Sequence, residues 1–206
     1  ADLAIKYDAY VITDEVYEHI VYAPNKHIYM ASLPGMRERT IVCNSLSKTY
    51  SITGWRLGYV IANPQVIDRV KKVHDFLTVG AAAPLMEAAV TGLKFGDDYY
   101  EGLAAHYTHM KELFCGGLKN LGFTFTEPQG AYYVLMDVSE FGVKDDVKFC
   151  EWVTEHVGVA AVPGSSFFRE DVHNLIRFHF AKKDETLNAA LDNLATLRAK
   201  ADGFKE

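Results

Sequence analysis

The residues best suited to chemistry lie in one polar stretch, residues 45–58 (SLSKTYSITGWRLG). Lys48 stands among Ser, Thr and Gly residues, and Arg56 follows it by eight positions. A lysine amine can attack an aldehyde to form an imine, and nearby positive charge favours the neutral, reactive amine. Hydroxyl groups and a guanidinium together suit a phosphate group. The spacing alone favours a surface lysine in a polar loop, with Arg56 in a salt bridge.

Two further segments carry polar side chains in or next to apolar strands. Asp14 ends an apolar segment and Tyr17 follows three residues later, while Arg177 interrupts the apolar run 175–180 (LIRFHF). A carboxylate at such a place is costly unless it is paired, and a protonated ring nitrogen could pair with Asp14. Tyr17 could then donate to a phenolic oxygen of that ring; alternatively, Asp14 caps a helix and Tyr17 is a core residue. A charge within an apolar strand usually pairs with a carboxylate, so Arg177 is expected to contact one from the protein or from a substrate.

The elements that must position these residues follow from hydrophobic patterning. Residues 9–13, 40–44 and 57–62 are short, apolar and rich in β-formers, which predicts strands buried on both faces of a parallel α/β sheet. Ligands bind beyond the carboxyl ends of such strands, where Asp14 and Lys48 are placed. Between the third strand and Gly80, apolar residues at helical spacing predict a helix packed on the sheet: Val66, Ile67, Val70, Val73 and Phe76.

The remaining sequence predicts a second, smaller unit. A helix is expected at 83–95, and Asp97 with Asp98 should cap a long helix to about 121, which Gly116 and Gly117 could kink or weaken. Strands are predicted at 123–126, 131–137, 159–162 and 175–181, with helices at 146–156 and 184–200. We therefore expect residues 1–97 to form part of a large, mostly parallel α/β domain. Residues 98–206 should form a small α+β domain that begins with the long linking helix.

Composition narrows the class of protein. The chain has 206 residues, of which 49% are hydrophobic and 23% charged, as in ordinary globular domains. The formal net charge of −6 argues against a nucleic-acid surface, and no apolar run approaches the roughly 20 residues of a membrane span. Three widely spaced cysteines predict no disulfide framework or metal-binding pair, which favours the reducing cytoplasm. The helical pattern of residues 1–8 lacks a preceding N-cap residue, so we expect a chain truncated upstream.

Four segments together resemble the class I/II aminotransferases of fold type I. These are residues 12–22 (ITDEVYEHIVY), 45–59 (SLSKTYSITGWRLGY), 161–167 (AVPGSSF) and 176–181 (IRFHFA). Residues 31–40 (ASLPGMRERT) are similar to the kynurenine/methionine and aspartate/aromatic branches of that family. The resemblance extends over nearly the whole chain. It implies transfer of an amino group from an L-amino acid to a 2-oxo acid, with pyridoxal 5'-phosphate as cofactor and no metal.

The resemblance also implies roles for individual residues. Lys48 would form the Schiff base with the cofactor and then move a proton between the substrate Cα and the cofactor. Asp14 would hold the pyridinium nitrogen and so keep the ring an electron sink, and Tyr17 would contact its phenolic oxygen. Arg177 would clamp the substrate α-carboxylate. The phosphate would be bound by Ser45 and Arg56, with Ser47 as a weaker candidate.

Other implications concern partners and alternatives. The family's sites form across homodimers, and further cofactor contacts lie in an upstream half, so we expect weak or no catalysis from these residues alone. The same lysine, aspartate and arginine also serve carbon–sulfur β-lyases and cyclising synthases. An aminotransferase-like domain can instead sense ligands in a transcription regulator, which would require an upstream DNA-binding segment. A structural unit without a ligand is the remaining alternative.

Overall fold

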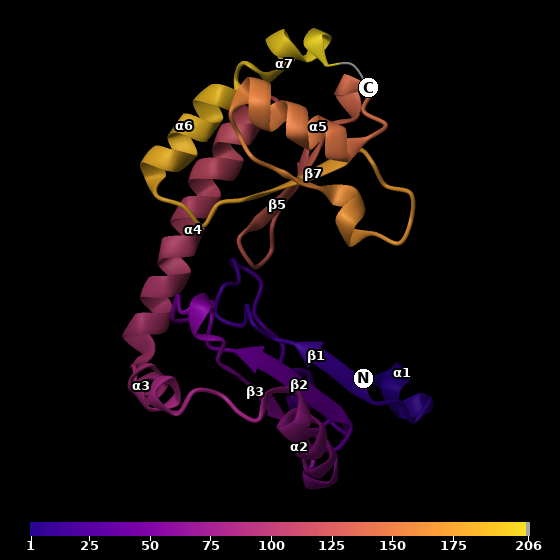
Figure 1. Ribbon diagram of the computed structural model, residues 1–206, viewed down its shortest axis with the longest axis vertical. Coiled ribbons are helices and arrows are strands. Elements are labelled where there is room, and N and C mark those ends of the chain that lie inside the picture. The colour runs from indigo at the N-terminus through magenta and orange to yellow at the C-terminus, as the bar shows by residue number, and fades with distance from the viewer. Residues whose placement is uncertain (205–206) are drawn as a thin grey trace. The chain divides into compact units, whose positions relative to one another are not determined.

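The computed structural model describes residues 1–204, which divide after Ala104 into two compact units (Figure 1). The division falls within helix α4 (Asp97–Asn120), whose first residue is also where the predicted large domain ends. The assignment of 1–97 and 98–206 to a large and a small domain stays a prediction. Within residues 1–204, every helix is too short or too polar to cross a bilayer.

A three-stranded sheet organises the first unit. Its strands are β1 (Val11–Asp14), β2 (Thr40–Ser45) and β3 (Gly58–Ile61), in the order β1-β2-β3, and the short helix α1 (Asp2–Lys6) precedes them. β1 and β2 are parallel, as predicted, with Asp14 opposite Cys43. β3 instead runs antiparallel to β2, with Gly58 opposite Ser45. The connection 46–57 holds only the 3₁₀ turn η2 (Thr53–Trp55), too little for the crossover that a parallel return needs.

The predicted helices of the first unit are present, but the side chains of α2 are more exposed to solvent than predicted. α2 (Pro64–Thr78) begins at Asn63, whose Oδ1 accepts a hydrogen bond from Val66 N at 3.0 Å, and α3 (Ala83–Leu93) follows. The predicted packing of α2 is wrong, because no residue of the helix is buried and Phe76 is 92% exposed. Burial of the strands on both faces is also wrong, since Ile12 on β1 is 71% exposed. An amphipathic pattern defines an apolar face but does not supply the layer that covers it.

The second unit contains an antiparallel sheet of four strands packed with helices. The strands are β4 (Phe125–Thr126), β5 (Tyr133–Asp137), β6 (Val162–Pro163) and β7 (Leu175–His179), in the order β4-β5-β7-β6. Buried Ile176 and Phe178 alternate along β7 with Arg177, which therefore points to the other face of the sheet. The helices beside these strands are the second half of α4, α5 (Asp146–Trp152) and α6 (Asp184–Leu194) (Figure 1).

Several helix ends differ from the sequence predictions. α5 ends at Trp152 and continues as the π-helical turn η4 (Val153–Val157), and the strand expected at 159–162 is reduced to β6. The terminal helix breaks after Leu194, where Thr196 Oγ1 donates to Asn193 O at 2.7 Å, and resumes as α7 (Leu197–Lys200). Side-chain hydrogen bonds of this kind compete with the helical ladder, which a periodic apolar pattern cannot reveal.

Helix α4 runs without interruption through Gly116 and Gly117, the two residues that could have kinked or weakened it. Packing explains the glycine at position 117, because a Cβ there would collide with the Leu191 side chain of α6. Asp97 and Asp98 occupy the first turn of α4 rather than preceding it. Their carboxylates there complement the positive end of the helix dipole.

Candidate active site

Lys48 lies in a tight turn that follows β2. Tyr50 N donates to Leu46 O at 3.2 Å and Ile52 N donates to Ser47 O at 3.0 Å, so the backbone coils around the lysine. The residues on either side of Lys48, Ser47 and Thr49, are both buried, while Lys48 itself is half-buried. The turn therefore fixes the Lys48 backbone while leaving the side chain access to solvent.

The hydroxyl of Ser45 organises the start of this turn. Its Oγ accepts from Ser47 N at 3.1 Å and lies 2.7 Å from Ser47 Oγ and 3.0 Å from Leu57 O. The two serine hydroxyls that the sequence singled out are thus brought together at the carboxyl end of β2. The neighbouring strand must carry glycine at position 58, because a Cβ there would stand 2.7 Å from Asn44 O.

Tyrosines from the start of α4 hold the other side of the turn. Tyr99 donates its hydroxyl to Thr49 O at 2.7 Å, and the hydroxyls of Tyr50 and Tyr100 lie 2.8 Å apart. Burial, assisted by the hydrogen bond with Tyr100, raises the pKa of Tyr50 above its ordinary value. The Tyr50 hydroxyl consequently remains a protonated hydrogen-bonding group at neutral pH. Sequence analysis did not identify these phenols, because 50 residues separate each pair in the chain.

Arg56 follows the 3₁₀ turn η2 and adopts a left-handed backbone conformation with φ 55° and ψ 42°. Its side chain is exposed, and Nη1 donates to Thr53 O at 3.0 Å. A guanidinium carries five N–H donors, so most of its donor capacity remains for an anion. The structure thus places Arg56 on the polar turn that begins at Ser45, as its sequence position predicts.

Asp14 lies at the carboxyl end of β1, beside the end of β2. It is exposed, and its Oδ1 accepts from Val16 N at 3.2 Å. Tyr17 is half-buried in the turn that follows. A shallow hollow of about 450 Å³ at these strand ends is lined by Ile12, Thr13, Asp14, Val16, Cys43, Asn44 and Ser45. Asp14 and Ser45, predicted to share one ligand, therefore line the same hollow.

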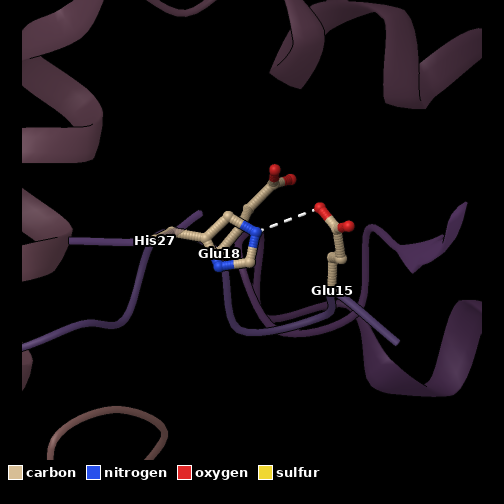
Figure 2. Close-up of side chains that lie close together, drawn as sticks. All are labelled: Glu15, Glu18 and His27. Carbon is tan, nitrogen blue, oxygen red and sulfur yellow. Dashed lines mark hydrogen bonds and ion pairs between the residues drawn. The ribbon is translucent and has the colours of Figure 1, made fainter. Parts of the chain in front are cut away.

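A cluster of buried Glu15 with half-buried Glu18 and His27 supports the Asp14–Tyr17 turn (Figure 2). Glu15 is only 4% exposed, and its Oε2 lies 3.0 Å from His27 Nε2, as the dashed line shows. Its other oxygen accepts from Thr13 Oγ1 at 2.9 Å. Glu18 accepts from Asn44 Nδ2 at 2.8 Å, which links the turn to β2 next to Ser45.

The charge of this cluster influences the neighbouring phenols. Burial, together with the Glu18 carboxylate, raises the pKa of Tyr29 to about 12. Carboxylates and imidazole are also metal-ligand types, and the ligand atoms of the three residues lie within 4.8 Å of one another. Each of the three already has a protein partner, so the cluster is complete as a hydrogen-bonded support. Sequence analysis missed it because His27 lies 12 residues from Glu15.

Arg177 belongs to the second unit, on β7 between β5 and β6. Its guanidinium carbon lies 4.2 Å from the ring centre of Tyr133 and 3.9 Å from that of Phe167. Within residues 1–204 no carboxylate forms an ion pair with Arg177, so the protein partner that a strand arginine usually has is missing there. The N–H groups at the edge of its planar guanidinium can therefore donate to a carboxylate from outside these residues.

Comparison with known proteins decides the family. The family model described as aminotransferase class I and II matches residues 1–194. The chain belongs to this aminotransferase family. Methionine aminotransferase of Escherichia coli is 36% identical over 192 residues, which cover 93% of this chain and 50% of that protein. Human kynurenine–oxoglutarate transaminase 3 is 37% identical over 210 residues, covering 92% of this chain and 46% of that protein.

Solved aminotransferase structures share the fold. N-succinyldiaminopimelate aminotransferase from Mycobacterium tuberculosis superposes with a TM-score of 0.90 at 33% identity, covering 96% of this chain and 52% of that one. The aromatic aminotransferase of Pyrococcus horikoshii gives a TM-score of 0.89 at 32% identity over 97% of this chain and 54% of that one. The fold is therefore the α/β fold type I of the aminotransferases. The chain spans about half the length of the curated relatives it matches.

Class I/II aminotransferases use pyridoxal 5'-phosphate. The donor set at the ends of β1 and β2 fits that cofactor chemically. It offers a carboxylate for a protonated ring nitrogen, paired hydroxyls and an exposed guanidinium for a phosphate, and an amine for an aldehyde. The glycine at position 58 also leaves the backbone beside Ser45 uncrowded by a side chain.

Proposed function

We propose that this chain contributes to an enzyme that transfers an amino group from an L-amino acid to a 2-oxo acid. The main observation behind this proposal is that Asp14 and Ser45 lie at the ends of adjacent strands and line one hollow. The turn that contains Lys48 follows directly after Ser45. Family membership and the relatives named as methionine and kynurenine transaminases support the proposal.

We propose that five residues hold the cofactor besides Lys48. When bound, pyridoxal 5'-phosphate supplies an aldehyde that combines with amines and a ring that withdraws electrons from the substrate. Asp14 keeps the ring nitrogen protonated by accepting its hydrogen bond, and the Tyr17 hydroxyl binds the phenolic oxygen. The phosphate is bound by Ser45, Ser47 and Arg56, whose guanidinium retains N–H groups not used by Thr53.

The substrate is handled by two cationic residues in this proposal. Lys48 would hold the cofactor through its amine, and the same amine would take a proton from the substrate Cα and return one. Arg177 binds the α-carboxylate through two parallel N–H donors, the arrangement that a planar guanidinium favours. The absence of a protein carboxylate on Arg177 within residues 1–204 supports this role.

We further propose that these residues correspond to the C-terminal half of a fold type I subunit that acts as a cytoplasmic homodimer. The half-length match to the relatives and the exposed apolar residues of the first unit support this arrangement. Catalysis by the 206 residues alone should accordingly be weak or absent. Robust turnover by the purified chain would contradict this expectation.

Covalent trapping tests the assignment of Lys48. The chain is incubated with pyridoxal 5'-phosphate, reduced with borohydride and mapped by peptide mass. We expect one dominant phosphopyridoxyl site at Lys48, lost in Lys48→Ala and retained in the control Lys94→Ala, which removes an exposed lysine of the same unit. Labelling spread evenly over the exposed lysines would contradict an organised site.

A further inference from the structure

The guanidinium of Arg177 is held by two aromatic rings. Tyr133 lies on the neighbouring strand β5, two residues from Leu135, which is the register partner of Arg177. Because side chains alternate along a strand, Tyr133 and Arg177 share one face of the sheet. Phe167 reaches the same guanidinium from η5 (Gly164–Phe167), the short 3₁₀ segment after β6. Contacts with ring faces use no N–H group, so the donor edge of the guanidinium stays open.

The segment that carries Phe167 is fixed by a buried carboxylate. Asp146, at the start of α5, is 0% exposed, and its Oδ2 accepts from Ser165 N at 2.8 Å. Gly164 presses directly on β7, where a Cβ would collide with the backbone of Leu175. Phe167 therefore begins two residues from a backbone hydrogen bond that anchors η5 to α5 and to the strand of Arg177.

The second oxygen of Asp146 is also occupied. His173 Nδ1 lies 3.0 Å from Asp146 Oδ1, and His173 Nε2 lies 2.8 Å from Asp171 Oδ1. Both ring nitrogens face a carboxylate, which is the environment of an imidazolium that donates twice. Hydrogen bonds with Asp146 and Asp171 accordingly raise the pKa of His173. Burial alone would raise the pKa of Asp146, but the Ser165 and His173 hydrogen bonds outweigh it and lower that pKa.

We propose that Asp146 and Phe167 are positioning residues for Arg177. Asp146 anchors η5 through Ser165, and η5 presents the Phe167 ring that, with Tyr133, fixes the plane of the Arg177 guanidinium. An oriented guanidinium presents both donors to a carboxylate in one geometry, whereas a mobile arginine loses side-chain entropy each time it binds. This inference rests on the proposed carboxylate-binding role of Arg177 and assigns the residues that prepare it.

The test compares two adjacent phenylalanines in the full chain. Phe167→Leu removes the ring but keeps apolar volume, and Phe168→Leu is the matched control, since both side chains are partly exposed and neither replacement threatens the core. The first measurement is the ring-current shift of the Arg177 side-chain NMR resonances, which are assigned by their loss in Arg177→Gln. The second is the affinity for pyruvate, used as a plain 2-oxo acid and followed in every variant through the backbone amide resonances of β7 and η5.

We expect Phe167→Leu to reduce the ring-current shift and to weaken pyruvate binding about 3- to 10-fold, the range of a partly exposed cation–π contact. Asp146→Asn, which keeps the side-chain shape, should reduce both quantities in the same direction. Phe168→Leu should leave both unchanged. Normal amide spectra away from η5 in each variant would show that the unit remains folded.

Two results would overturn the inference. One is an unchanged Arg177 shift in Phe167→Leu or Asp146→Asn, and the other is a reduced shift without any loss of pyruvate affinity. A different result would sink the proposed function itself: pyruvate affinity that is the same in Arg177→Gln as in the parent chain. The two failures are therefore distinguishable in one set of titrations.

Discussion

The two units differ sharply in how they bury apolar side chains. Of the twelve largest fully buried side chains in residues 1–204, ten lie in the second unit, and only Ile20 and Met36 lie in the first. The first unit instead exposes large apolar residues on its sheet and on α2, including Ile12, Phe76 and Leu77. The second unit therefore has a hydrophobic core of its own, whereas the first keeps much apolar surface in water.

The difference extends to the candidate site residues. Lys48 and its neighbours are held by hydrogen bonds within a turn, from Ser45, Thr53 and the α4 tyrosines. Arg177 instead sits on a strand whose adjacent residues, Ile176 and Phe178, are packed in the core. Polar anchoring in the first unit and apolar packing in the second should respond differently to mutation.

The largest expected effect comes from the core of the second unit. Phe149 is fully buried against Phe141, Trp152 and Phe204, so Phe149→Ala should lower the free energy of unfolding by about 3–5 kcal/mol. The matched variant Phe76→Ala, on exposed α2, should change it by less than about 0.5 kcal/mol. Urea unfolding followed by circular dichroism measures both. Equal losses in the two variants would contradict the contrast between the units.

A smaller effect is expected where the first unit depends on close backbone approach. Gly58→Ala would place a Cβ against Asn44 O and should cost about 1–3 kcal/mol through displacement of β3. Gly54→Ala is the control, because nothing lies within 4 Å of its Cβ position. Thermal unfolding reports the stability, and phosphopyridoxyl labelling reports Lys48. The close approach of position 58 to Asn44 O would be unimportant if Gly58→Ala and Gly54→Ala had the same melting temperature and the same labelling of Lys48.

The smallest effect is a pH dependence in the second unit. Hydrogen bonds with Asp146 and Asp171 raise the pKa of His173 in the folded state. The stability that protonated His173 contributes is therefore fully present below the ordinary histidine pKa of about 6.5, and it is lost as pH rises through the raised pKa. The pKa of Asp146 is lowered, so the stability that its carboxylate contributes is lost instead as pH falls through the lowered pKa. The unfolding free energy of the parent chain should thus exceed that of His173→Gln at about pH 6 and converge with it near pH 9. A gap that widens with rising pH would reverse this assignment.

Sequence patterns predicted candidate site residues where these residues lie next to predicted strands in the chain. Asp14 and Ser45 end β1 and β2 and line one hollow, and Lys48 follows Ser45 by three residues, so the predicted strands also indicated where these residues lie. The hydrogen-bonded residues that support these site residues could not be predicted from sequence patterns, because they pair distant positions, such as Asp146 with His173, 27 residues apart. Burial of α2 was wrongly expected for a related reason: periodicity gives a helix its apolar face but does not name the surface that covers it.

The left-handed backbone at Arg56 has a consequence for protein engineering. Glycine is the residue that tolerates this conformation at no steric cost, and a non-glycine residue there sacrifices stability. A redesign guided only by folding free energy would therefore select glycine at position 56. That choice would delete the guanidinium proposed to neutralise the phosphate, so thermal stability and cofactor retention are competing objectives at this single position.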